Sequence, residues 1–198
     1  MRVKTVLFSF LVISLMSSVL FADTATDKGK FMADVNFYFF NGTTTMDDGS
    51  DTESDDSGLD VAFYLGYFIM NDLEVGAFTE VDYSASEIYD IERTTKSNLY
   101  GLFARYYLMR EMPVRPFAGI NAGIGTSTNT ATGTEDMNWD LTFVIPSVGV
   151  SYFINEHVGF HLAAAYNISS YTEDDDLEYT FDMDHTHFGI NLGTSISF

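Results

Sequence analysis

Apolar and polar side chains alternate along most of this chain, and the alternation is clearest in its last stretch, residues 186–198. One face of this stretch is polar or glycine, and the other face is apolar and ends on the C-terminal residue itself. The apolar face consists of Phe188, Ile190, Leu192, Thr194, Ile196 and Phe198. Because successive side chains of a strand point to opposite faces, the pattern predicts a β-strand with one apolar side.

Seven earlier segments alternate in the same way, at 30–40, 58–70, 73–83, 96–109, 116–126, 141–153 and 158–168. Short turns at 71–72, 109–115 and 154–157 alternate with long polar connections at 41–57, 84–95, 127–140 and 169–182. An up-and-down barrel with alternating short and long connections has this arrangement. We therefore predict an all-β, eight-stranded antiparallel barrel. Within the sixth strand, Pro146 lacks a ladder donor and predicts a bulge or a local register break.

The two faces of these segments indicate where the barrel lies. One face carries nearly all the aliphatic side chains, and the other combines glycines with ionisable residues. The ionisable residues are Asp34, Asp60, Glu74, Glu80, Asp82, Arg105, His161, His185 and His187. A soluble lipocalin has the opposite arrangement, with an apolar interior. Charges belong in a lumen and aliphatic side chains against lipid, so the barrel is expected to span a membrane.

The N-terminus supplies the compartment. Residues 1–22 have a basic start at Arg2 and Lys4, then an apolar run and small residues before Ala22, as in a secretory signal peptide. An uncleaved membrane anchor is the alternative. Cleavage leaves residues 23–198 as one domain, and its net charge falls from −20 to about −22 because Arg2 and Lys4 are lost. Such a negative chain is not expected to bind nucleic acid.

Several segments resemble the small eight-stranded barrels of the bacterial outer membrane, the family of OmpX, OmpW and the OmpA transmembrane domain. They are the stretches 100–107, 115–125 and 149–157 together with the terminal strand. The resemblance implies an outer-membrane location and contact with outer-membrane lipid. It also implies that the barrel-assembly machinery, after periplasmic chaperones, reads Phe188, Ile190, Leu192, Ile196 and Phe198 as an assembly signal.

Three functional classes stay open on this sequence. The first is a structural or surface-interaction protein, adhesin-like or antigen-like, without a through-pore. The second is a narrow channel or a conduit for small hydrophobic molecules, and the third is a lipid-modifying enzyme. We expect the first class, because eight strands enclose a lumen that side chains such as Tyr64, Phe103 and Tyr107 can fill. We expect no enzyme, because the strand around His185 lacks a serine in hydrogen-bond register with it.

Few residues suggest binding chemistry, and we expect no cofactor. His185 and His187 share a face and could present two imidazoles to a metal, with Asp34 and Asn36 as neighbours if the first strand pairs with the last. No third ligand can be named, so lumen lining is the preferred interpretation. Acidic runs at 47–56 and 173–182 are expected to form a solvated surface, with weak binding of divalent cations as the alternative.

The strand pattern also predicts an ion pair inside the barrel. The third and fourth strands are expected to pair antiparallel with Glu74 opposite Arg105, and both side chains belong to the inward face. An unpaired buried charge costs several kcal/mol, so the arginine needs a carboxylate beside it.

The assembly signal can be tested at the last residue. Replacing Phe198 with Asp should leave secretion intact and block insertion of the barrel into the membrane. Heat-modifiability on gels and fractionation of cell envelopes measure insertion directly. Normal amounts of embedded, heat-modifiable Phe198→Asp protein would contradict the assignment.

Overall fold

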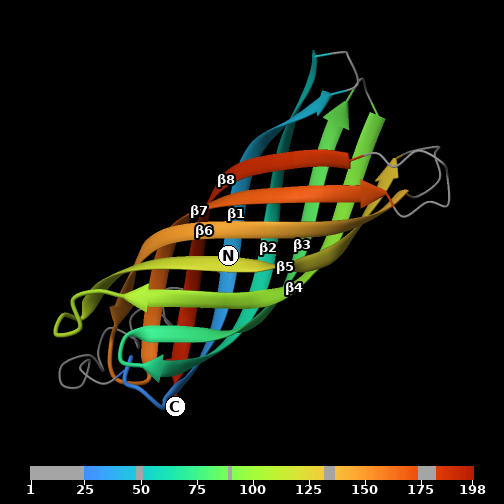
Figure 1. Ribbon diagram of the computed structural model, residues 1–198. Coiled ribbons are helices and arrows are strands. Elements are labelled where there is room, and N and C mark those ends of the chain that lie inside the picture. Colours follow the sequence, from blue (N-terminus) through green and yellow to red (C-terminus); the bar gives the residue numbers. More distant parts are fainter. Residues whose placement is uncertain (1–24, 48–50, 89–90, 132–136, 174–181) are drawn as a thin grey trace, which may run out of the picture.

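The computed structural model shows a closed barrel of eight antiparallel strands in simple sequence order (Figure 1). The structure describes residues 25–47, 51–88, 91–131, 137–173 and 182–198, and it describes side chains outside 41–57, 85–93, 131 and 173–185. No helix in the described residues is long and apolar enough to cross a membrane. The strands are β1 (Phe31–Asp47), β2 (Asp51–Met70), β3 (Leu73–Ile88), β4 (Ile91–Tyr107), β5 (Val114–Ala131), β6 (Met137–Phe153), β7 (Val158–Glu173) and β8 (Asp182–Ser197).

The barrel closes where β1 pairs with β8. The ladder runs from Met32 opposite Ser197 to Asn41 opposite Phe188. Beyond it, Phe31 and Phe198 exchange two backbone hydrogen bonds of 2.9 Å, so the last residue of the chain is part of the closure. Closure leaves no unpaired sheet edge. In a membrane this is required, because no water is available to pair with the backbone N–H and C=O groups of an edge strand.

The alternation assigns each strand face as the sequence predicted. Leu102 and Leu162 on the outer wall are 70% and 47% exposed, whereas Ala163 points inward and is 6% exposed. The inward aromatic side chains that were expected to fill the lumen are all buried: Tyr64, Phe68, Phe78, Phe103, Tyr107 and Phe153. The core of the protein is therefore the lumen itself.

The lumen is packed in two layers. One apolar cluster lies at the end with the short turns and includes Met32, Phe68, Tyr107, Phe117 and Phe153. The other lies in the middle and toward the long hairpins, and it includes Tyr38, Tyr64, Phe78, Phe103, Leu141, Phe143 and Ile145. Below we call these the lower and the upper cluster, and the two ends of the barrel the short-turn end and the long-hairpin end.

The long connections differ from the prediction. The ranges 41–57, 84–95, 127–140 and 169–182 were expected to be loops, but β-pairing continues through most of them, as far as Asp47 opposite Asp51 and Ile88 opposite Ile91. Threonine and serine favour strands, and pairing outside the membrane needs no apolar face. The long hairpins therefore extend the barrel at one end, as Figure 1 shows for β1 and β2. Residues 48–50 and 174–181, with part of both acidic runs, lie outside the described residues.

The prediction of a bulge or register break at Pro146 is wrong, although pairing is interrupted at this residue. The pairing of β5 with β6 passes through Pro146 without interruption. The pairing of β6 with β7 stops after Val144 and resumes at Ser147 in the same register, so no residue is inserted. The missing N–H of Pro146 accounts for an interruption without a shift. A true register shift lies elsewhere, between Phe68 and Met70 of β2.

The faces of β7 can be tested with single cysteines, because the chain has no cysteine of its own. A lipid-soluble thiol probe should label cysteines at Leu162, Ala164 and Tyr166 and spare those at Gly159, His161 and Ala163. Arginine at Leu162 should cost roughly 2 to 4 kcal/mol, because it would place a charge in hydrocarbon. Labelling of the odd-numbered positions would reverse the assigned faces.

Candidate functional site

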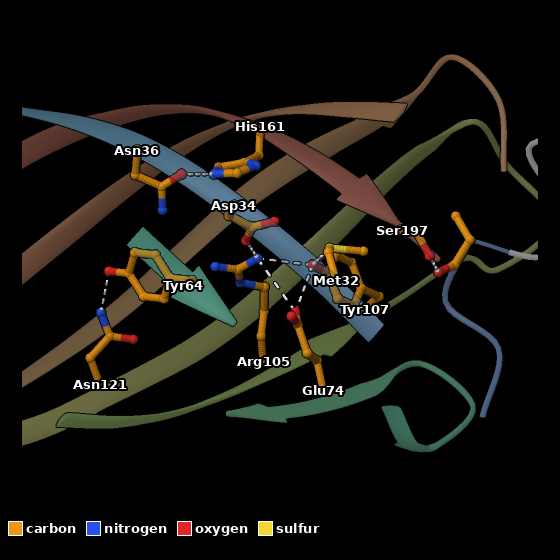
Figure 2. A network of polar contacts seen from close by, with 11 residues as sticks. Met32, Asp34, Asn36, Tyr64, Glu74, Arg105, Tyr107, Asn121, His161 and Ser197 are labelled. Atoms are coloured by element: carbon orange, nitrogen blue, oxygen red, sulfur yellow. Dashed lines mark hydrogen bonds and ion pairs between the residues drawn. The ribbon is translucent and has the colours of Figure 1, made fainter. Parts of the chain in front are cut away.

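The lumen is organised around the guanidinium group of Arg105, which β4 carries into the middle of the barrel (Figure 2). Its Nη1 donates to Asp34 Oδ2 at 2.8 Å and to the Tyr107 hydroxyl at 3.0 Å, and it lies 3.5 Å from Glu74 Oε2. Tyr107 in turn donates to Glu74 Oε2 at 3.1 Å. All four side chains are buried. One cation is therefore shared between two carboxylates and a phenol.

The two carboxylates reach Arg105 by different routes. Glu74 is its direct cross-strand neighbour, in the register that the sequence predicted. Asp34 is closer, although it comes from β1, three strands away around the barrel. An eight-stranded lumen is narrow enough for side chains from opposite walls to meet. Gly66 makes room for this arrangement, because a side chain there would overlap the carboxylate of Glu74.

Aromatic rings surround the remaining faces of the guanidinium group. Its central carbon lies 5.2 Å from the ring centre of Phe117, 5.5 Å from that of Phe103 and 5.8 Å from that of Tyr64. Each ring presents the negative face of its quadrupole to a cation at such distances. Arg105 thus joins the lower and upper clusters.

Nearer the long-hairpin end, three carboxyl groups face one another. Asp60 interacts with both Asp82 and Glu80, and Asp82 lies directly opposite it on β3. The Ser97 hydroxyl donates to Asp82 at 3.4 Å. This part of the lumen is therefore rich in carboxyl groups.

A small cavity lies between Arg105 and the acidic cluster. It has about 30 Å³ open to the centres of water molecules, and its lining includes Tyr38, Glu80, Asn121, Ile145 and Asn191. Two or three waters would occupy roughly this volume. This cavity is too small for an organic ligand.

His161, which the sequence placed on the inward face, contacts Asn36 through its Nε2 (Figure 2). Gly193 lies beside them, and a side chain at this position would overlap both partners. On the adjacent part of the lumen Asn121 donates to the Tyr64 hydroxyl at 2.9 Å. These contacts tie β1, β5 and β7 to the lumen filling.

The predicted surroundings of the two terminal-strand histidines are wrong. Asp34 and Asn36 pair with Ser195 and Gly193, well below the level of His187. His187 packs instead against Phe40 and Tyr38, with ring centres 4.7 and 5.9 Å away. The side chain of His185 lies outside the described residues. In the part of the chain that is described, no three His, Cys, Asp or Glu side chains are arranged so that they could hold a metal ion.

The segment before β1, residues 25–30, crosses the short-turn end, and we call it the N-terminal strap. Ala25 and Thr26 are fully buried. Thr26 donates its hydroxyl to Asp72 Oδ1 at 2.6 Å and accepts the Asp72 N–H at 2.9 Å. The Ser197 hydroxyl donates to the Ala25 carbonyl at 3.1 Å. The strap is therefore fastened to the β2–β3 turn and to the end of β8.

Arg115 fastens the strap from below the lower cluster. It is fully buried, contacts the Thr26 hydroxyl, lies 3.8 Å from Asp72 and stacks on Phe153. Arg115 was predicted to lie in a turn, and Arg105 was the one arginine predicted on the inward face. The alternation could have found it, because the inward positions of β5 are odd-numbered and Arg115 continues that series by one step.

The predicted assembly-signal residues all lie on the outer wall. Phe188, Ile190, Leu192, Ile196 and Phe198 are exposed on β8 or directly after it. Phe198 also stacks on Phe31 of β1, with ring centres 6.0 Å apart. Their reading by an assembly machinery stays a prediction.

The shared cation can be tested by a double-mutant cycle. Arg105→Met should lower the unfolding free energy by about 3 kcal/mol, because two buried carboxylates lose their counter-charge. Adding Asp34→Asn and Glu74→Gln should recover part of the loss, and each should show coupling of about 1 to 3 kcal/mol to Arg105. Urea titration of protein folded in lipid vesicles measures these energies. Arg110→Met, which removes an exposed arginine, is the matched control, and absence of coupling to both carboxylates would contradict the network.

Comparison with solved structures shows two barrels of the same size. Neisserial surface protein A is 18% identical, with a TM-score of 0.58, and the match covers 86% of this chain and 100% of that one. The outer membrane protein OprG from Pseudomonas aeruginosa is 17% identical, with a TM-score of 0.58, and the match covers 89% and 99% of the two chains. At such identity the likeness concerns the fold alone.

A family comparison goes further than these structures. No curated protein matches this chain. The family described as outer membrane protein beta-barrel domain matches residues 8–195, which is nearly the whole sequence. The chain therefore belongs to the outer membrane protein beta-barrel domain family, and it is a protein of the bacterial outer membrane.

Proposed function

We propose that this protein is a non-conducting barrel of the outer membrane that acts at the cell surface through its acidic long hairpins, and that it is not an enzyme. The observation that carries the proposal is the closed lumen. The N-terminal strap covers the short-turn end, the lower cluster lies directly behind it, and Arg105 with its aromatic rings fills the next level. We infer that these three levels leave a solute no path through the described part of the lumen.

If the barrel transports no solute, the long hairpins are the part of the protein that we propose acts at the cell surface. Most of the acidic residues outside the lumen lie in the long hairpins, and the chain has a net charge of −20. Self-repulsion keeps such segments solvated and exposed, and it disfavours anionic partners. The hairpins are thus suited to partners with a positive surface, and to weak binding of divalent cations through carboxylate oxygens. One structural neighbour, Neisserial surface protein A, is a surface protein by name.

The proposal includes the partners of biogenesis. The outer wall from β1 to β8 suits contact with lipid, and the barrel-assembly machinery and periplasmic chaperones would act before insertion. The exposed apolar row of β8, ending at Phe198, is the feature that supports this part of the proposal.

A second candidate function is a side conduit for small hydrophobic molecules. The observation that favours it is the interrupted ladder between β6 and β7, beside Pro146. Ile145 and Ser147, on either side of Pro146, line the small lumenal cavity together with Ala163 and Ala165 of β7. A widening of this interruption would connect the cavity with the surrounding lipid.

Conductance of the purified protein in planar bilayers tests the first proposal. The unaltered protein should give no stable current steps, with a known porin as the control for incorporation. Arg115→Ala combined with Arg105→Ala should give brief openings, because the strap loses its buried contacts with Thr26 and Asp72 and the middle level of the lumen loses the group that fills it. Glu111→Ala, which removes an exposed side chain from the neighbouring turn and no strap contact given for the described residues, should stay silent. Stable steps from the unaltered protein would overturn the proposal.

The same protein in vesicles distinguishes the second candidate. Uptake of a small apolar dye by the unaltered protein, abolished by Pro146→Val, would favour the side conduit over the closed barrel. Val at this position supplies the missing N–H and should complete the ladder with β7. Equal uptake with protein-free vesicles would exclude the conduit.

A further inference from the structure

The outer wall carries a groove near the long-hairpin end that none of the roles above uses. It lies across β4 to β7 and has a volume of about 310 Å³. Tyr100 and Ile124 form part of it, and they are 57% and 66% exposed, which places the groove on the lipid side and not in the lumen. Gly125 also lines the groove, although its side-chain position faces the lumen and Leu99.

The groove sits at the upper edge of the apolar wall. Tyr100, Ile124, Thr142 and Ser170 are direct cross-strand partners and form one row around the barrel. One step below this row, toward the short-turn end, the outward residues are apolar, as at Leu102. The row therefore changes from apolar on β4 and β5 to hydroxyl-bearing on β6 and β7.

The next row toward the long hairpins is polar. Thr126, Asp140 and Thr172 are cross-strand partners in it, and all three line the groove. The groove thus joins an apolar lower part to an upper part that holds hydroxyl groups and one carboxylate. No lysine or arginine is among its lining residues.

We propose that this groove binds an amphiphile with an uncharged, hydroxyl-rich headgroup, that is, a glycolipid of the outer leaflet. The position at the edge of the apolar wall fits a molecule whose chain lies in hydrocarbon and whose headgroup lies in the interface. Threonine and serine hydroxyls both donate and accept, as sugar hydroxyls do, and the Asp140 carboxylate accepts from them. An anionic phosphate headgroup is disfavoured beside Asp140, because no lysine or arginine is among the residues that line the groove.

The probe for this site is dodecyl maltoside, added to isotope-labelled protein that is folded in micelles of an uncharged polyoxyethylene detergent. Amide signals of Gly125, Thr126, Asp140 and Thr142 should shift and saturate, while those of the opposite wall stay in place. Dodecylphosphocholine, which has the same chain length and no sugar, should give no saturable shift at these residues.

Variants on the outer wall decide the matter without touching the lumen. Thr126→Val with Thr142→Val should weaken dodecyl maltoside binding roughly tenfold, because two hydroxyl groups are lost at constant shape. Thr194→Val, an exposed outward threonine of β8 remote from the groove, is the matched control and should bind as the unaltered protein does. Unsaturable shifts, equal binding of dodecylphosphocholine, or unchanged affinity of the double variant would each overturn the proposal.

Discussion

The structure depends on one constraint, which is that every backbone donor and acceptor within the membrane must be paired inside the protein. The exchange of hydrogen bonds between Phe31 and Phe198 completes this pairing, because it joins the first strand to the last residue of the chain. Once the sheet is closed, each side chain faces either lipid or lumen. Within the membrane, polar side chains can then lie only in the lumen. Their number and charge determine how the lumen is packed.

In the lumen, the buried charge of Arg105 is balanced by neighbouring side chains. A buried guanidinium group is costly without partners, and here two carboxylates, a phenol and three aromatic faces surround it. The same contacts bring β1, β3 and β4 together across the lumen. The contacts that neutralise Arg105 thus also hold the lumenal side chains in place. The N-terminal strap crosses the short-turn end of the barrel.

Much of the fold could be predicted from the sequence, because side chains along a strand point alternately to its two faces, and this alternation can be read from a short segment. It assigned the inward faces, the eight strands and the register that sets Glu74 opposite Arg105. The contact of Asp34 with Arg105 was not found as the closest pair, since it depends on barrel diameter and on which walls face each other. Such distances are properties of the closed sheet and are not encoded in any single strand.

The remaining differences have the same origin. The strap contacts of Thr26 and Arg115 join segments 89 residues apart, and no periodic pattern marks residues 25–30. The long hairpins were taken for loops because their polarity was read as irregularity, although polar strands pair as well outside lipid. Pro146 was expected to shift the register, but a missing donor removes pairing without changing the residue count.

The central claim is that the lumen is closed to solutes, and access of a charged, water-soluble thiol reagent to one inward cysteine tests it most directly. Ala165 lines the lumenal cavity and is buried, and the chain has no other cysteine to react. A cysteine at Ala165 in vesicle-embedded protein should stay unmodified until the barrel is unfolded, while a cysteine at the exposed Lys28 of the strap reacts at once in open membranes. Rapid modification at position 165 in the folded barrel would contradict the account.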